Sequence, residues 1–589
     1  MALGLFAAVQ TFILFARRDR FAVLFWWTKE SWLLVTLLWL KDLALAAAAF
    51  FVFFRIVRWS ETLPDPPEPE DSGFRLRHAL LFAGILAAGV AMRWVAPRQI
   101  PPGVWGDAPA EVEAALREPG RIPWFGGRPF GAQGGASNAL VSYLYVKFCE
   151  LLFRVFGRGD VGILALSAVG GSLALPAVFW LGREIAGRRV ALIAMTLSSL
   201  AMSPLVFSRW AYTAAMLLPL VLAAAAAALR AIATGRVAWA ILAGLLLGLS
   251  LHTYVPSWAV AAGFGVFAST MLSRPERRKL VFAGGIATFA AFLPFGISFL
   301  EFPGRLGGRA RDVSFLIRTR DVTLPGGNGP FAPPLRLLYN AVEYSGVLLW
   351  TGDPNPKNGI PGRPAVSVLI GVAALAGTAL SWRRARSGDP GHRLLLAIAG
   401  ASLLAGIFSD AVGSPSALRV YPFVGASILL AAFGFVRWVP ASARALPVRV
   451  EFLWALGFSL VLVLETVPFF AVWPDNGLVG GSFCPQGTAA GRLARNLAGA
   501  PTILDPQAIW PIVFETLAAG RDPDRPVPRL PRRTAADLLD APPREAFWYV
   551  ARRSELDRLR GGTFHCARGV SVDEATGDTV IARVVPASR

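Results

Sequence analysis

Long uncharged stretches of apolar residues recur along most of the chain, from about residue 79 to residue 473. A helix needs roughly 20 such residues to cross about 30 Å of hydrocarbon. Stretches close to this length lie at 161–181, 190–208, 210–229, 280–300, 365–382, 394–409, 420–436 and 452–473. Residues 79–96 form a weaker stretch because they contain Arg93, and residues 237–273 are long enough for two spans, divided at 252–257. The pattern predicts about eleven membrane-spanning helices.

The two ends of the chain depart from this pattern. Residues 1–60 are hydrophobic but interrupted by charges, which predicts an appendage of one or two further helices, followed by an acidic, proline-rich cytoplasmic linker at 61–77. After residue 473, candidate strands at 502–504, 547–550 and 570–585 accompany a candidate helix at 554–560. We therefore predict an all-α polytopic membrane protein of about 11–13 transmembrane helices, counting the appendage, with its main bundle at 78–473 and a small soluble α/β domain at 474–589.

Composition supports a membrane protein and excludes several other classes. Hydrophobic residues make up 54% of the chain and charged residues 16%, whereas a soluble domain carries roughly a quarter charged residues. Three cysteines and four histidines without clustered spacing exclude a zinc finger and a disulfide-stapled secreted fold. The net charge of +20 would otherwise suggest a nucleic-acid partner, but its distribution has another cause.

Basic residues gather in alternate turns between the predicted helices. Assigning successive turns to opposite sides places the basic segments 183–189, 230–236, 274–279, 383–393 and 437–449 on one side. By the positive-inside rule that side is the cytoplasm. The net positive charge therefore reflects how the helices are oriented in the membrane, and we expect no nucleic-acid partner. Outer loops at 97–159 and 301–364 and the domain at 474–589 then face outward from a bacterial cytoplasmic (inner) membrane. Cys484 and Cys566 in that domain form either a disulfide or two free buried thiols.

The first outer loop contains a carboxylate at the predicted membrane surface. Asp107 lies in the segment 101–111, close to Trp105. A partly desolvated carboxylate there could act as a general base or hold a metal ion. An Asp before Ala-Pro also suits the N-cap of a helix, and this loop alone favours the cap.

Several segments together resemble the GT-C class of polytopic glycosyltransferases, which includes the family 39 protein O-mannosyltransferases and the aminoarabinose transferases. The resemblance covers about residues 79–473. In chain order it rests on 103–107 (GVWGD), 181–189 (LGREIAGRR), 207–209 (FSR), 248–256 (GLSLHTYVP), 352–364 (GDPNPKNGIPGRP) and 416–419 (SALR).

The resemblance implies an inverting transfer of a sugar from a polyprenyl-phosphate donor, without a covalent sugar–enzyme intermediate. Asp107 would be the catalytic base. The residues implied to bind the donor phosphate or sugar are Arg209, His252, Tyr254, Asp353, Lys357 and Arg419. Arginine suits this task because its planar guanidinium binds phosphate through two hydrogen bonds. The acceptor would be a protein, a lipid or a polysaccharide, and membrane lipids would surround the enzyme.

The chain also departs from the pattern of that class. The acidic pair of the first loop is reduced to Asp107 followed by Ala108, so Glu111 or Glu113 would have to supply the second acid. A divalent cation is the only cofactor that the resemblance suggests, and the missing acid weakens that expectation. His252 replaces the first tyrosine of the 248–256 motif.

Two other classes of function stay open at this point. A transporter of a lipid-linked precursor or a solute has a similar helix count, although the matched halves typical of transporters are not evident. A noncatalytic assembly factor that binds a glycolipid is compatible with the missing second acid. Structural explanations also exist for single residues: helix-end arginines can anchor a helix, and His252 can be a structural group. Glu465 is costly to bury inside a span, but we do not place it in the site.

Overall fold

The structure is a computed structural model, and it describes most of the chain after residue 75. The longer described ranges are 76–105, 112–129, 140–210, 213–303, 332–409, 415–445, 449–483, 485–494, 502–505, 530–540, 545–560, 564–566 and 579–586. Residues 44, 55, 109, 514–515, 518, 543 and 570–571 are also described. The predicted N-terminal appendage and most of the predicted linker therefore lie outside the described residues.

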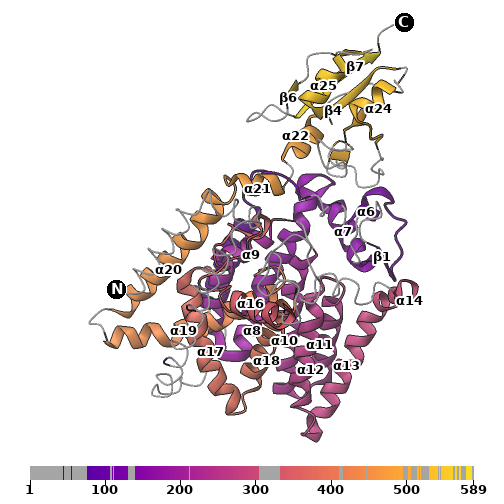
Figure 1. The fold of residues 1–589 in the computed structure, drawn as a ribbon. Helices are drawn as coiled ribbons and strands as arrows, with labels where there is room; N and C mark the ends of the chain where they lie inside the picture. The colour runs from indigo at the N-terminus through magenta and orange to yellow at the C-terminus, as the bar shows by residue number, and fades with distance from the viewer. Residues whose placement is uncertain are drawn as a thin grey trace.

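A helical bundle forms the body of the molecule (Figure 1). Its long apolar helices are α4 (Leu76–Trp94), α8 (Asp160–Leu200), α10 (Ala214–Thr234), α11 (Val237–Ser250), α12 (Pro256–Ser269), α13 (Pro275–Gly296), α17 (Val368–Arg386), α18 (Pro390–Ile407), α19 (Tyr421–Ala445) and α20 (Val450–Val467). Among the described residues, six helices are long and apolar enough to cross a membrane. Apart from the outer end of one span, described next, the predicted spans correspond to the ten helices named above. Helix α8 covers two predicted spans, because it kinks at Ala186 and Gly187, where Gly187 has φ +82°.

One predicted span is wrong in its outer part. Residues 190–208 were expected to form one helix, but α8 ends at Leu200 and a separate short helix, α9 (Met202–Phe207), follows. Ala201 between them has an extended backbone, with φ −59° and ψ 133°. Pro204 is compatible with the first turn of α9, where an N–H is not needed, but it would interrupt a continuing helix.

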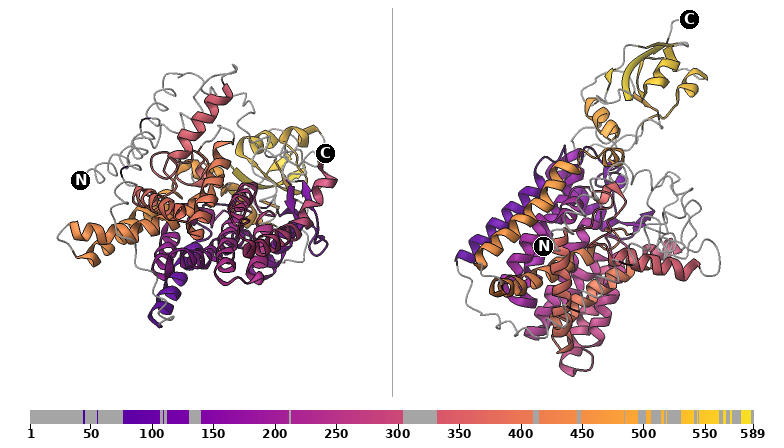
Figure 2. Two further views of the ribbon diagram at one scale, coloured as in Figure 1. Left: turned by 90° about the horizontal axis from the view of Figure 1, so that it is seen from below. Right: turned by 60° about the vertical axis from the view of Figure 1, so that its left-hand side comes forward.

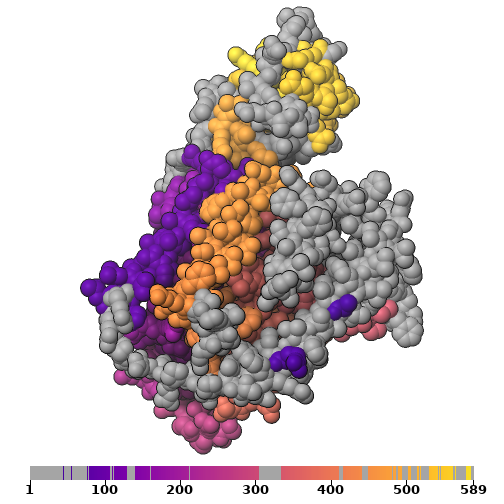
Figure 3. All heavy atoms as spheres, turned by 90° about the vertical axis from the view of Figure 1, so that its left-hand side faces the viewer, coloured from indigo at the N-terminus to yellow at the C-terminus, as the bar shows by residue number. Residues whose placement is uncertain are grey.

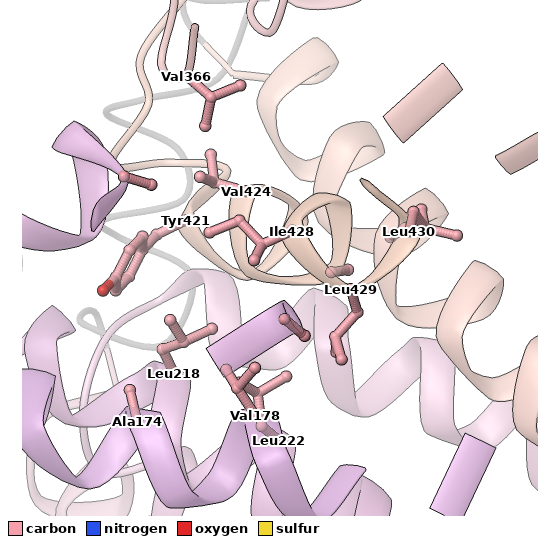
Figure 4. Close-up of a cluster of buried hydrophobic side chains, with 14 of the residues drawn as sticks. Ala174, Val178, Leu218, Leu222, Val366, Tyr421, Val424, Ile428, Leu429 and Leu430 are labelled. Atoms are coloured by element: carbon pink, nitrogen blue, oxygen red, sulfur yellow. The ribbon is translucent and has the colours of Figure 1, made fainter. Parts of the chain in front are cut away.

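The core of the bundle lies where α8, α10 and α19 meet. Figure 4 shows Val178 of α8, Leu222 of α10 and Leu429 of α19 pointing into one cluster, and all three are buried. Helix α17 packs closely on α19, because a Cβ added at Gly377 would meet the Leu430 carbonyl oxygen at 1.7 Å. Small residues at such crossings allow close helix packing in membranes.

Several basic turns lie at one end of the bundle. Arg230 at the end of α10 pairs with Glu184 of α8 at 3.9 Å, and Gly391 at the start of α18 packs against the backbone of Ile185. The sheet of the C-terminal region lies at one end of the molecule, beyond α21 (Gly477–Ser482) and α22 (Pro485–Ala494), and the turn from α12 to α13 lies at the opposite end (Figure 1). That the basic end faces the cytoplasm remains a prediction.

Short elements cover the loop end of the bundle, by which we mean the end that carries residues 95–159, α9 and residues 346–367. These elements are α6 (Glu113–Arg117), β1 (Gly127–Pro129), β2 (Leu140–Ser142), α7 (Tyr143–Phe156), α14 (Ser298–Glu301), α16 (Ala332–Ser345) and the 3-10 helix η2 (Pro356–Asn358). Strands β1 and β2 pair antiparallel. Helix α7 is amphipathic, since it buries Val146 and Phe153 while Leu151 and Val155 stay exposed. This surface suits a helix at a membrane interface.

A small α/β region follows the bundle, as the sequence predicts. The π-helical turn η3 (Pro468–Val472) extends α20 and leads to α21 and α22. The sheet contains β3 (Thr502–Leu504), β4 (Phe547–Arg552), β5 (Phe564–Cys566), β6 (Val570–Ser571) and β7 (Thr579–Pro586), with helices α24 (Ala535–Asp540) and α25 (Arg553–Arg560). Its strand order is β3-β4-β7-β5, and β6 also pairs with β7. The right-hand view of Figure 2 shows this region projecting beyond the bundle. Cys484 and the side chain of Cys566 lie outside the described residues.

Candidate functional site

The second long loop is organised around the buried carboxylate of Asp353, which is 4% exposed. Its Oδ1 accepts a hydrogen bond from the backbone N–H of Asn355 at 2.8 Å. Its Oδ2 accepts from the side-chain amide of Asn358 at 2.6 Å and from the backbone N–H of Ala417 at 2.8 Å. The Asp-Pro-Asn-Pro sequence favours this tight turn. One carboxylate thus joins the second loop to the segment that begins α19.

Lys357 connects this second loop to the first. It lies in η2, and its backbone N–H donates to the side-chain oxygen of Asn355 at 3.2 Å. Its Nζ is 4.0 Å from the ring centroid of Trp105 and 5.3 Å from that of Trp210. The two indole rings meet edge to face, with centroids 6.1 Å apart. An ammonium over aromatic faces is attracted by their quadrupoles, so Lys357 is held where three segments of the chain meet.

Arg419 lies near the same carboxylate, at the start of α19. Its Nη1 donates to Ser409 Oγ at 3.0 Å. Tyr344 supports this turn, because its hydroxyl accepts from the backbone N–H of Ser416 at 3.1 Å and lies 3.2 Å from Ser409 Oγ. The positive charge of Arg419 also acts on Asp353. Arg419 and Asp353 therefore lie close together at the loop end of the bundle, and Lys357 belongs to the loop that Asp353 organises.

Arg209 is buried and bound to backbone carbonyls. It is 1% exposed, and its Nη2 donates to the Met92 carbonyl at 2.6 Å. The guanidinium lies 5.6 Å from the ring centroid of Phe469. These contacts tie the turn after α9 to the end of α4. A contact from Arg209 to a donor phosphate stays a prediction, and its described contacts are structural.

Both ring nitrogens of His252 have protein partners. Nε2 lies 2.8 Å from the carbonyl oxygen of Ala291, and Nδ1 lies 2.7 Å from Ser142 Oγ. Because a carbonyl only accepts, Nε2 carries the hydrogen and Nδ1 accepts from the serine hydroxyl. Burial lowers the pKa of His252, so the ring is neutral at pH 7. This geometry favours a structural role that joins β2 to α13, while Tyr254 is half-buried against the bundle core.

The acidic side of the predicted site is only partly described. Asp107 and Glu111 lie outside the described residues. Glu113 forms ion pairs with Arg117 at 2.7 Å and with Arg128 at 3.3 Å, so it stabilises the loop at its own position. Within the described ranges, no group of three or more His, Cys, Asp or Glu side chains could hold a metal ion.

Sequence reasoning left Glu465 out, yet it links three elements beside the site. Its carboxylate is fully buried and accepts from the backbone N–H of Met202 at 2.8 Å and from that of Ser367. Arg363 Nη2 is 3.4 Å away. An acidic residue within a membrane span suggested a functional role. Its partners could not be predicted from the sequence, because they are more than 95 residues away along the chain. Trp210 and Tyr344 were missed for the same reason, because their partners come from other helices.

Removal of the Glu465 carboxylate is expected to destabilise the protein strongly. Glu465→Ala leaves the backbone N–H groups of Met202 and Ser367 without their acceptor and removes the anionic partner of Arg363. Breaking a buried pair in this way costs about 3–5 kcal/mol. Glu465→Gln keeps one acceptor oxygen and should cost less, about 1–3 kcal/mol. Unfolding in lipid nanodiscs measures both variants. Glu451→Ala, at an exposed position on the same helix, serves as the control, and equal stability of all three proteins would contradict the assignment.

The predicted sugar-transfer activity is expected to fall at acidic pH because Asp353 becomes protonated. Burial raises the pKa of Asp353 to about 6, although its three hydrogen bonds and Arg419 act in the opposite direction. Once protonated, the carboxyl cannot accept all three hydrogen bonds, so activity should fall as the pH drops through about 6. Since the unfolded pKa is about 3.9, the folded protein retains a proton between about pH 4 and 6, and the contribution of this group to stability decreases as pH rises across that window.

A pH–activity profile checks this expectation. Asp353→Asn should lower activity and remove the limb near pH 6. Asp389→Asn is the matched control, because Asp389 also caps a turn by accepting backbone N–H bonds, from Gly391 and His392 at the start of α18. An unchanged limb in Asp353→Asn would assign the titration to another group.

Comparison with known proteins identifies the fold. Residues 143–297 match the dolichyl-phosphate-mannose-protein mannosyltransferase family. The crystal structure of ArnT from Cupriavidus metallidurans bound to undecaprenyl phosphate is similar with a TM-score of 0.51 and 14% identity, over 86% of this chain and 97% of that one. The Archaeoglobus fulgidus oligosaccharyltransferase in its apo form gives a TM-score of 0.46 and 15% identity, over 75% of this chain and 64% of that one. A search of curated protein sequences finds no match.

The fold is that of the GT-C class of multi-pass membrane proteins, and residues 143–297 match a glycosyltransferase family. The resemblance read from the sequence is confirmed at the level of this class. The likeness to ArnT shows the fold, and the reaction and the roles of single residues are inferred below.

Proposed function

We propose that the protein transfers a hexosyl or pentosyl group from a polyprenyl-phosphate sugar to an acceptor on the outer face of the bacterial cytoplasmic membrane. The observation that carries the proposal is the position of Lys357. Its ammonium lies over Trp105 and Trp210, while Asp353 ties the same loop to the segment that holds Arg419. Lys357 and Arg419 thus belong to segments that Asp353 joins at the loop end of the bundle.

This arrangement suits a lipid-phosphate leaving group. The phosphate of such a donor lies at the membrane surface while its chain remains in the bilayer. Negative charge grows on the phosphate oxygen as the bond to the anomeric carbon breaks, and a positioned cation stabilises that charge. Lys357 and Arg419 would serve this purpose, with Asp353 as a positioning residue. The structure of ArnT with undecaprenyl phosphate offers a precedent for such a ligand in this fold.

The acceptor side depends on Asp107. In the proposed reaction Asp107 removes the proton of an acceptor hydroxyl or amine, which attacks the anomeric carbon opposite the phosphate. The new bond to the acceptor forms as the carbon–oxygen bond to phosphate breaks, and the phosphate departs with the electron pair. The configuration at the anomeric carbon is inverted. Protein hydroxyls, lipid head groups and polysaccharides would all be suitable acceptors.

The test is sugar transfer by the purified full-length protein in liposomes. Radiolabelled polyprenyl-phosphate sugars are supplied one at a time with a membrane extract as acceptor, and both labelled product and released polyprenyl phosphate are measured. Transfer from at least one donor supports the proposal and names the sugar. Binding of polyprenyl phosphate without transfer from any donor would overturn it in favour of an assembly factor. Movement of labelled lipid across the bilayer without transfer would favour a transporter.

A further inference from the structure

The C-terminal region contacts the first long loop at residues 103–104, which precede Asp107 in the sequence. The backbone N–H of Val104 donates to Thr488 Oγ1 of α22 at 3.1 Å, and this bond is buried. Next to it, a Cβ added at Gly103 would lie 2.1 Å from the carbonyl oxygen of Phe483 and 3.0 Å from the backbone of Pro485. The chain that follows α21 therefore lies directly on residues 103–104.

A second contact with the C-terminal region is made by Arg117, which follows Asp107 in the sequence. Arg117 of α6 donates through Nη2 to Glu515 Oε2 at 2.8 Å and through Nε to Glu113 Oε1 at 2.7 Å. The Glu515 side chain is fully buried, and its Oε1 accepts from the backbone N–H of Leu530 at 2.9 Å. Glu515 of the C-terminal region thus holds α6 through one ion pair with Arg117, which also pairs with Glu113 of the same helix.

The character of these contacts separates them from ordinary surface pairs. Arg117 is 11% exposed and Glu515 is not exposed at all, so water screens their attraction poorly. The pair between Arg558 and Glu555 on α25 has an arginine that is 59% exposed, and such pairs contribute little. Because they are buried, the contacts of Arg117 with Glu515 and of Val104 with Thr488 can hold the backbone of the first loop in one position.

We infer that Thr488 and Glu515 are positioning residues that hold the first long loop from both sides for the transfer reaction. This inference rests on the proposed function, because residues 105–112 between the two contacts include Asp107. The C-terminal region is accordingly a structural part of the acceptor side of the site. It acts through the loop and needs no contact with the sugar donor.

The test combines two readouts on the full-length protein in liposomes. Glu515→Gln, Arg117→Gln and Thr488→Val are each expected to lower kcat about tenfold to a hundredfold, as a small misplacement of reacting groups does. Binding of polyprenyl phosphate should stay unchanged, because Lys357 and Arg419 are untouched. The double variant Arg117→Gln/Glu515→Gln should lose less than the two single variants combined, since both remove the ion pair between Arg117 and Glu515.

Hydrogen–deuterium exchange provides the readout that is independent of activity. Exchange of peptides covering 101–117 should rise in Glu515→Gln and in Thr488→Val. It should stay at the wild-type level in the control Asp557→Asn, which removes the exposed pair between Asp557 and Arg560 on α25. Unchanged exchange, or unchanged kcat in an active protein, would overturn the inference. Increased exchange in a protein whose wild type transfers no sugar would instead overturn the proposed function while the loop contacts stand. Thr488→Val keeps the test decisive if Glu515→Gln does not fold.

Discussion

Replacing Lys357 by methionine is expected to lower kcat/KM for sugar transfer about 10²–10³-fold, the effect of removing one group that stabilises developing charge. Methionine keeps the length of the side chain and its packing on Trp105 and Trp210, so the change removes the charge with little change of shape. Lys357→Arg keeps the charge and should retain more of the activity. Initial rates at several donor concentrations measure all three proteins.

The chain contains a matched control for this change. Lys147 on α7 also lies over an indole ring, 5.5 Å from the centroid of Trp124, and pairs with Glu150 at 3.1 Å. Lys147→Met removes the same charge from the same kind of setting, away from Asp353, and should leave kcat/KM near that of the wild type. Equal losses in both variants would indicate a general effect of charge. Full activity of Lys357→Met would remove this residue from the phosphate site.

Replacing Asp107 by asparagine is expected to lower kcat about 10²–10⁴-fold, the usual contribution of a general base. The amide cannot accept the acceptor's proton, whereas the binding of polyprenyl phosphate depends on cations elsewhere and should persist. The expected signature is therefore intact lipid-phosphate binding with very little transfer. Single-turnover measurement with preloaded donor separates the two quantities.

A nearby acid provides the comparison. Glu118 is exposed in the same loop, and Glu118→Gln removes one negative charge from it without touching the proposed base. Its rate should match the wild-type rate. Glu111→Gln tests the candidate second acid, and a loss comparable to that of Asp107→Asn would restore the acidic pair. Wild-type transfer by Asp107→Asn would contradict the proposed mechanism.

The positions of the helices could be predicted from the sequence because membrane spans have a strong local signature. About 20 apolar residues must occur together in any span, so even the kink within α8 was predictable as a boundary between two spans. The break between α8 and α9 was not predictable from hydropathy, since Ala201 and Met202 are both apolar. Pro204 favours a new helix start there, and the backbone N–H of Met202 at that start donates to the distant Glu465.

The candidate site divides in the same way. Asp353 and Arg419 could be proposed from short motifs, because the turn chemistry of Gly-Asp-Pro-Asn-Pro is local. The packing of Lys357 on Trp105 joins residues more than 250 positions apart, and no local pattern contains that information. Arg209 and His252 were predicted as ligands of the donor, but their polarity is also what buried carbonyls and a buried serine need. Sequence alone could not distinguish these two uses of a polar side chain.

Helix α20 shows how weakly the last span is embedded in the protein. Leu460 and Val463 on this helix are 44% and 56% exposed, and Figure 3 shows α20 along one outer face of the molecule. Its polar contacts lie near one end, at Glu465 and at Trp473, whose Nε1 donates to the Pro356 carbonyl at 3.0 Å. Among the described residues little covers the outer face of this helix, so we expect lipid to contact it. Since the chain continues from α20 through η3 into α21, lipid composition should affect how the C-terminal region is held.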